Sequence, residues 1–176
     1  MINDTAAPLN YVNATQINAQ IPWGTAPGPA TATVTSGGTA SAPFPFSVAP
    51  TGPGIFTFGS NRAVAQNEDY TLNNTGNGAA VGSFVIVYMT GGGAVDPSID
   101  TGAAAKPKPP SYVKAHSSAT IGGKTADVLF LGMAPYFVGV VQADVKVPSL
   151  PAGDYPVVIT IGGVQSNAPL VTVSGK

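Results

Sequence analysis

The only histidine of the chain and its polar neighbours are the first candidates for catalysis. His116 stands in "KAHSSAT" beside Ser117 and Ser118, and Asp127 follows farther along. A serine nucleophile needs a histidine base and a carboxylate that converge in space, and the chain has no nucleophile-elbow pattern to position the serine. The alternative interpretation is a histidine at a strand edge near a polar loop. One histidine also excludes a multi-histidine zinc or copper site within a single chain.

Two loops carry oxygen ligands of the kind that calcium binds. Asp96 and Asp100 are four residues apart in "GGGAVDPSIDTG", and Glu68 and Asp69 are adjacent in "QNEDYTLNN". Calcium accepts mixtures of carboxylate, amide and carbonyl oxygen. Neither loop matches an EF-hand or nonapeptide pattern, so solvated turns are the alternative. A calcium ion near His116, with Asp96 as a ligand, would activate water for weak hydrolysis of esters or lactones.

Aromatic side chains could instead form a platform on which sugar rings stack. The candidates for ligand binding are Trp23, Tyr112 and Tyr136. Trp23 follows a strand-ending proline, and the alternative is that it packs between two modules. Four phenylalanines in apolar runs are expected in the core, namely Phe56, Phe84, Phe130 and Phe137.

Composition limits the classes of partner and the ways in which these residues can be positioned. Only 9% of the residues are charged and the net charge is −1, so nucleic acid is a poor partner. No run of apolar residues is long enough for a spanning helix, and no signal peptide is expected in this chain. The absence of cysteine excludes disulfides. The 22 glycines and 17 prolines disfavour long helices and favour short strands joined by tight turns.

The chain contains a repeat that indicates how its strands are organised. "QINAQIP" at 16–22 resembles "QADVKVP" at 142–148, and both alternate with a period of two. In the second copy Ala143, Val145 and Val147 are expected to face inward. In the first copy the inward positions are Ile17, Ala19 and Ile21. A proline then ends each strand, because it cannot donate a backbone hydrogen bond.

Glycine turns extend the repeat in both directions. "ATATVTSGGTAS" at 30–41 resembles "VVITIGGVQS" at 157–166, with a constant offset of 125 residues (162 − 37 for the glycines). A further hairpin at Gly122 and Gly123 needs positive φ angles. Its counterpart is the opening "MINDTAAPL", in which Ile2, the Asn3–Asp4 turn, Thr5 and Ala6 are predicted to match Ile121, the Gly-Gly turn, Thr125 and Ala126.

These patterns predict an all-β chain of two tandem immunoglobulin-like β-sandwiches, the first lacking its N-terminal strands. We expect a truncated module at 1–58, a linker and hairpin at 59–80, and a complete module at 81–176. The complete module begins with "GSFVIVYMTGGG" at 82–93 and ends with "APLVTVS" at 168–174.

Several of these segments together resemble the acidobacterial C-terminal domain of unknown function that is named after Solibacter. They are "YVNATQINAQIPW", "GPGIFTF", "GSFVIVYMTGGGAVDP", "TIGGKTADVLFLGMAPYFVGVVQADVKVP" and "LPAGDYPVVITIGGVQSNA", and they cover most of the chain. The resemblance implies paired immunoglobulin-like modules of the IPT/TIG kind at the C-terminus of long secreted or surface proteins. The family has no agreed activity, so the resemblance carries over no catalytic residue.

The first copy departs from the family because the strands expected before Ile2 are absent. An unpaired sheet edge beside apolar side chains favours pairing with another strand. The sequence therefore predicts self-association through the open edge near Ile2, or coverage of that edge by the segment 50–80.

The leading hypothesis from the sequence is a non-catalytic extracellular or cell-surface module for adhesion, spacing or assembly. Its expected partners are a second copy, a polysaccharide or a surface protein, with neither nucleic acid nor membrane insertion. No cofactor is required by this hypothesis. The alternative is the calcium-assisted hydrolase of esters or lactones, which would use His116 and Asp96.

Overall fold

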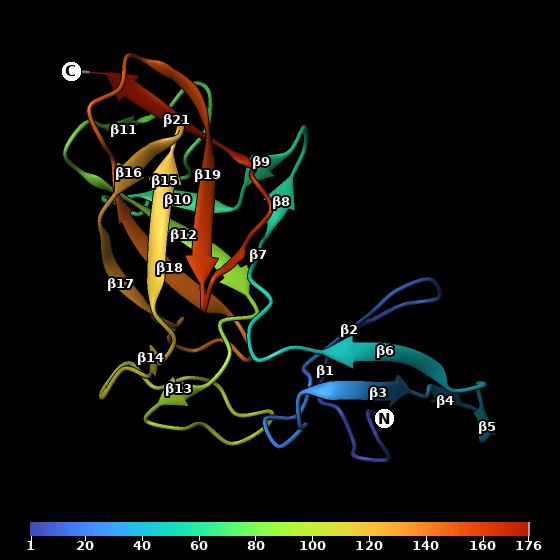
Figure 1. Cartoon of the computed structure of the whole chain (residues 1–176). Helices are drawn as coiled ribbons and strands as arrows, with labels where there is room; N and C mark the ends of the chain where they lie inside the picture. The colour runs from blue at the N-terminus through green and yellow to red at the C-terminus, as the bar shows by residue number, and fades with distance from the viewer. Residues whose placement is uncertain (176) are drawn as a thin grey trace.

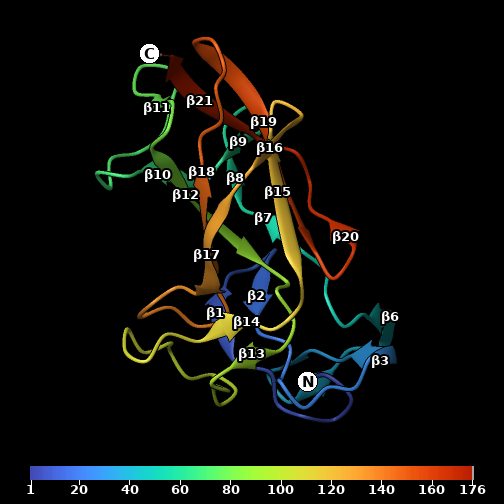
Figure 2. The same cartoon turned by 60° about the vertical axis from the view of Figure 1, so that its left-hand side comes forward.

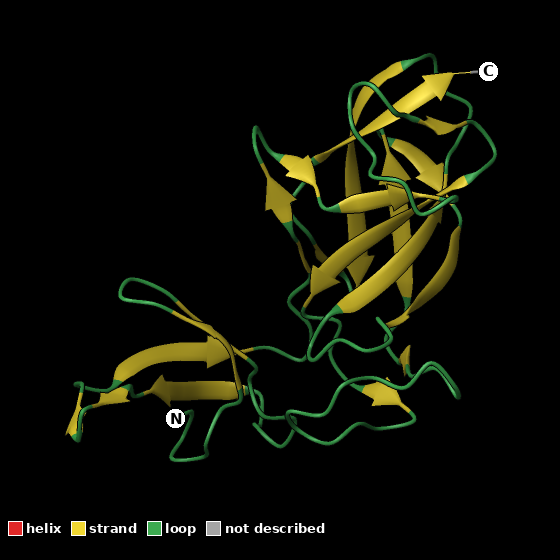
Figure 3. Ribbon diagram, turned by 180° about the vertical axis from the view of Figure 1, so that it is seen from behind, coloured by secondary structure: helices red, strands yellow, loops and turns green. Residues whose placement is uncertain are grey.

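The computed structural model describes residues 1–175 and shows an all-β protein, as predicted. Strands and loops account for this whole range, without a helix (Figure 3). Accordingly, no helix in the described part of the chain has the length and hydropathy needed to cross a membrane. The strands from β7 onward form a sandwich of two sheets, and the strands before it form a separate N-terminal segment (Figure 1).

The first sheet of the sandwich is built around two long antiparallel strands, β12 and β18. In spatial order its strands are β10 (Ala65–Asn67), β12 (Phe84–Thr90), β18 (Val141–Lys146), β17 (Val128–Met133), β14 (Tyr112–Val113) and β13 (Val95–Asp96), with β7 (Gly54–Ile55) also beside β12. Val85 lies opposite Val145 and Val87 opposite Ala143. Each of these four side chains is fully buried, so the predicted inward face of β18 is confirmed.

The second sheet is built around β19 and completes the sandwich. In spatial order its strands are β16 (Lys124–Ala126), β15 (Ser117–Ile121), β19 (Gly153–Ile161), β21 (Leu170–Gly175), β9 (Arg62–Ala63) and β8 (Thr57–Phe58), while β11 (Ala79–Ala80) pairs with β21 and β20 (Val164–Gln165) with β19. Val157, Ile159 and Ile161 alternate along β19 and belong to the same apolar cluster as Val85 and Val145. This shared core holds the two sheets together.

Residues 59–80, which were expected to form a linker and hairpin, contribute β9 to β11 to the sandwich, and residues 51–58, which were assigned to the truncated module, contribute β7 and β8. The Thr51 hydroxyl donates to the backbone oxygen of Ile161 at 3.0 Å. Gly91 lets this segment cross the end of β12, because its φ is +75° and a Cβ there would lie 1.8 Å from the Gly52 oxygen. The alternative prediction, that the segment 50–80 covers the first copy, is not what the structure shows, since β7 to β11 pair with β12 and β21 and with each other.

The N-terminal segment, residues 1–48, consists of three two-stranded antiparallel sheets that extend to one side of the sandwich (Figures 1 and 2). The pairs are β1 (Leu9–Val12) with β2 (Ile17–Ala19), β3 (Gly28–Ala32) with β6 (Phe44–Val48), and β4 (Thr35–Ser36) with β5 (Thr39–Ala40).

The pairing register of this segment repeats that of the sandwich. Gly28 lies opposite Val48, and Gly153 lies opposite Val173, so both partners are displaced by 125 residues (153 − 28 and 173 − 48). The β4–β5 pair corresponds in the same way to the pairing of β19 with β20. Even a side-chain bond recurs, because the Ser41 and Ser166 hydroxyls accept from the backbone N–H groups of Val34 and Ile159, each at 3.1 Å.

The β1–β2 hairpin repeats β17–β18, including an irregularity in the first strand of each pair. The register shifts between Leu9 and Tyr11 in β1, and between Val128 and Phe130 in β17. Both shifts skip one residue, so the two strands carry the bulge at the same place, at an offset of 119 (128 − 9).

The turn at the start of the chain confirms the predicted hairpin with one correction. Asn3 and Asp4 have φ of +44° and +60°, and Gly122 and Gly123 have +59° and +74°. However, Ile2 pairs with Thr5 as Ile121 pairs with Lys124. Thr5 therefore occupies the position of Lys124, because the two-residue turn fixes its partner, and the predicted match with Thr125 is wrong by one residue.

Corresponding strands differ sharply in burial. Ile17, Ala19 and Ile21 were predicted to face inward, but all three are exposed, with Ile17 at 40% and Ile21 at 46%, so this prediction is wrong. Their counterparts in β18 are at most 2% exposed. The difference arises because β18 is flanked by β17 and β12 and covered by a second sheet, whereas β2 pairs with β1 alone among the described strands.

Candidate functional site

The residues proposed for a hydrolase, His116 and Asp96, both lie on the surface. His116 is exposed, and its backbone oxygen accepts from the N–H of Gly162 at 2.9 Å. Ser117 begins β15, where it pairs with Ile161. Asp96 is exposed in β13, where it pairs with Tyr112. His116 lies directly before the first residue of β15.

The predicted calcium loops do not form a cluster of ligating side chains. Asp100 is exposed and its backbone oxygen accepts from the N–H of Ala103. Asp69 accepts from both the N–H and the hydroxyl of Thr71, at 3.0 and 2.6 Å, and these bonds hold the pKa of Asp69 below its ordinary value. Glu68 beside it is exposed. Across residues 1–175 no three His, Cys, Asp or Glu side chains converge in a way that could hold a metal.

The aromatic candidates lie in different settings. Tyr112 packs its ring on Phe130, with centroids 5.4 Å apart. Tyr136 projects from the loop between β17 and β18 and is 77% exposed. Trp23 follows β2 and is the one candidate of the three that lines the main cleft. None of the four phenylalanines expected in the core is fully buried. Phe84 and Phe130 are half-buried. Phe56 and Phe137 are exposed, because they lie on a short connecting segment and a loop rather than on the inner face of a sheet.

A cleft of about 750 Å³ separates β2 from the near end of the sandwich. One wall is the run 16–21 together with Trp23. The other wall is formed by Phe56, by the glycines 91–93 after β12, and by the segment 138–141, which leads into β18. Its lining is mainly apolar and uncharged, so it suits an apolar, extended segment of chain better than a charged small molecule.

The N-terminal segment is tied to the sandwich beside this cleft by polar contacts. The buried Gln20 side chain accepts from the N–H of Gly102 at 2.7 Å. The Trp23 N–H donates to the Thr101 hydroxyl at 3.0 Å. Local sequence patterns predict neither contact, because both join residues that are about eighty positions apart.

Like β1, the strand β2 has an unpaired outer edge in the described part of the chain. β18, its counterpart in the sandwich, lies between β17 and β12, but β2 has β1 on one side and no further strand among residues 1–175. An unpaired strand edge presents backbone donors and acceptors that a further strand can satisfy. The edge of β2 therefore leaves room for a further strand.

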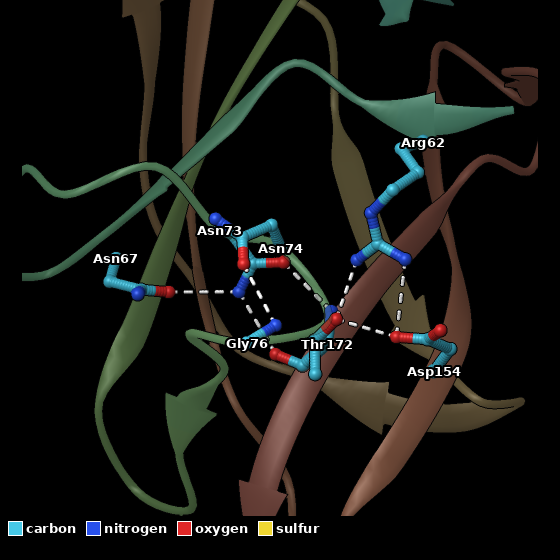
Figure 4. A network of polar contacts seen from close by, with 7 residues as sticks. All are labelled: Arg62, Asn67, Asn73, Asn74, Gly76, Asp154 and Thr172. Carbon is cyan, nitrogen blue, oxygen red and sulfur yellow. Dashed lines mark hydrogen bonds and ion pairs between the residues drawn. The ribbon is translucent and has the colours of Figure 1, made fainter. Parts of the chain in front are cut away.

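A separate polar network, which the sequence did not predict, fastens the segment 61–77 to β21 (Figure 4). Asn73 is 1% exposed, and its amide nitrogen donates to the Asn67 side chain at 2.8 Å and to the Thr172 backbone oxygen at 2.9 Å. The Thr172 N–H donates back to the Asn73 side-chain oxygen at 2.7 Å. Such paired amide contacts satisfy buried polar groups, so we assign the network a structural role.

Thr172 of β21 also contacts the one ion pair found among the described residues, which joins Arg62 and Asp154. Arg62 lies 3.2 Å from Asp154 and donates to the Thr172 hydroxyl, which itself donates to Asp154. The hydroxyl bond is the main reason that the pKa of Asp154 lies below its ordinary value, and Arg62 adds to the effect. Arg62 thus joins β9 to β19 and β21 within the second sheet.

No protein-family model matches the chain, and no curated protein sequence matches it significantly.

Proposed function

We propose that this protein is a non-catalytic, immunoglobulin-like module of an extracellular or cell-surface protein that serves in assembly, with adhesion and spacing as related roles. The resemblance to the Solibacter-type domain supports tandem IPT/TIG-like modules in a secreted or surface protein. The single observation that carries the proposal is that β1 to β6 repeat the register of β17 to β21 while their apolar side chains stay exposed.

Half of the large apolar side chains that are exposed in the described residues lie in the N-terminal segment. They include Leu9, Val12, Ile17, Ile21, Val34 and Phe44. Surfaces of this kind usually mark interaction sites, because isolated proteins rarely leave large apolar areas in water. A second copy is the partner that we propose first. A polysaccharide has weaker support, since Tyr112 and Tyr136 do not line the cleft that Trp23 lines.

Sedimentation velocity over a range of protein concentrations tests the assembly role. We expect species heavier than the 17.5 kDa monomer, with a fraction that rises with concentration. A strictly monomeric protein at the highest soluble concentration would contradict self-assembly.

The hydrolase alternative is tested on chromogenic esters and lactones, with and without a chelator. We expect no turnover above that of buffer. Turnover that a chelator abolishes, and that Asp96→Ala or His116→Ala also removes, would favour the calcium-assisted hydrolase instead.

A further inference from the structure

We propose that β2 pairs antiparallel with β2 of a second copy, across a twofold axis at Asn18. This inference rests on the proposed assembly role and names the surface that would carry it. It moves the contact from the edge near Ile2 to the edge of β2. The Ile2 edge is partly filled, because Ile2 pairs with Ala32 and the N–H of Thr33 donates to the backbone oxygen of Met1.

The complete sandwich shows what belongs at the edge of β2. There β12 runs antiparallel to β18, with Val87 opposite Ala143 and Val85 opposite Val145. The β2 positions that correspond to Ala143 and Val145 are Ile17 and Ala19, at an offset of 126 (143 − 17). An antiparallel strand with apolar residues at alternate positions therefore fits beside β2.

β2 itself meets this description. In an antiparallel pair centred on Asn18, Ile17 of one copy lies opposite Ala19 of the other. Residues directly opposite each other share a face of the sheet, so the apolar side chains of both copies meet on one face. The two Asn18 side chains meet on the other face. This centre also gives the longest overlap, because β2 spans Ile17–Ala19.

Charge does not oppose this pairing. Asp4 is the only charged side chain among residues 1–50. Strand edges that must stay unpaired are commonly protected by lysines or other charges, and β2 carries none. The adjacent cleft of about 750 Å³, which runs beside residues 16–21, leaves open space next to the strand.

Introducing a charge at Asn18 tests the proposed twofold axis. Asn18→Lys and Asn18→Asp each place two like charges opposite each other, and we expect each variant alone to raise the dimer dissociation constant at least about tenfold. An equimolar mixture of the two variants should restore dimers, since Lys then faces Asp. Sedimentation velocity in low salt measures both effects, because salt screens exposed charges.

Ser47→Lys and Ser47→Asp are the matched controls. Ser47 is exposed on β6, in the same N-terminal segment but in a different sheet. We expect these variants to associate like the wild type. Far-UV circular dichroism checks that all four variants are folded, and Asn18 is exposed, so its replacement leaves the core intact.

The outcomes separate this inference from the proposed assembly role. The pairing through β2 is overturned if the wild type dimerises and the Asn18 variants dimerise equally well, or if the Ser47 variants lose their dimers. Either result leaves the assembly role standing. A monomeric wild type overturns both. A monomeric wild type that binds a synthetic peptide with the sequence of residues 83–90 would assign the β2 edge to a strand from another source, and would likewise overturn pairing between copies.

Discussion

Asp144 and Asp154 lie in the same sandwich, but their surroundings shift their pKa values in opposite directions. Burial raises the pKa of Asp144 above its ordinary value of 3.8, and a hydrogen bond from Gln142 offsets part of this rise. The Thr172 hydroxyl, with Arg62, lowers the pKa of Asp154 in spite of some burial. The folded state therefore disfavours the charge of Asp144 and favours that of Asp154.

These directions predict opposite effects of neutralising the two residues. The stability that Asp154 supplies is present above its unfolded pKa and is lost as the pH falls through its lower folded pKa. Asp154→Asn should thus destabilise the protein at pH 7, with a difference that shrinks at acidic pH. The cost of the charged Asp144 is present at neutral pH and disappears as the pH falls through its raised folded pKa. Asp144→Asn should thus stabilise the protein at pH 7.

Urea unfolding between pH 2.5 and pH 7, about the range of carboxylate titration, measures both differences. If the difference in unfolding free energy between each variant and the wild type did not change with pH, the assigned pKa directions of Asp144 and Asp154 would be contradicted.

At the scale of single elements, the same hairpin occurs once inside a core and once in solvent. Val34 and Ile159 hold corresponding positions and make the same bond to Ser41 and Ser166. Ile159 is fully buried, whereas Val34 is 48% exposed. Backbone pairing is therefore alike in the two hairpins, and only the packing differs.

This pair separates the contribution of packing from that of backbone pairing. Ile159→Ala should lower the free energy of unfolding by about 2–5 kcal/mol, because it leaves a cavity between the sheets. Val34→Ala should change it by less than about 0.5 kcal/mol in the monomer, since little apolar surface is lost. Chemical denaturation at a protein concentration that keeps the chain monomeric measures both values, and equal losses would show that Val34 is packed in solution.

At the scale of the whole molecule, the sandwich and the N-terminal segment differ in how they are stabilised. The sandwich has a continuous core that spans both sheets. The N-terminal segment adds few buried side chains and is joined to the sandwich by contacts such as those of Gln20 and Trp23.

A fragment of residues 49–176 should therefore fold on its own. It retains β7 to β21 and the core, and it loses two hydrogen bonds to the N-terminal segment, which together contribute about 1–3 kcal/mol. Circular dichroism and thermal unfolding of the fragment measure its strand content and cooperativity. A fragment that fails to unfold cooperatively would show that residues 1–48 are needed for the fold.

Local patterns predicted much of the fold because they depend on neighbouring residues. The alternation in 142–147 gave β18 and its inward face, and the paired glycines gave the turns with positive φ at Gly122 and Gly123. The predictions for Phe56 and Phe137 were wrong, because an apolar run does not reveal whether a second layer covers it. The possible ligands near Asp96 and Glu68 were identified by type, but their convergence depends on contacts that local pattern does not determine.

The sequence by itself determined that the chain is all-β, that it repeats, and which residues of each strand share a face, since these properties follow from alternation and turn chemistry within a few positions. Only the tertiary structure decided which copy has a core, that residues 51–80 belong to the sandwich, and that the edge of β2 lies open beside a cleft. These features depend on which distant strands come together, and two segments with the same local pattern can differ in that respect.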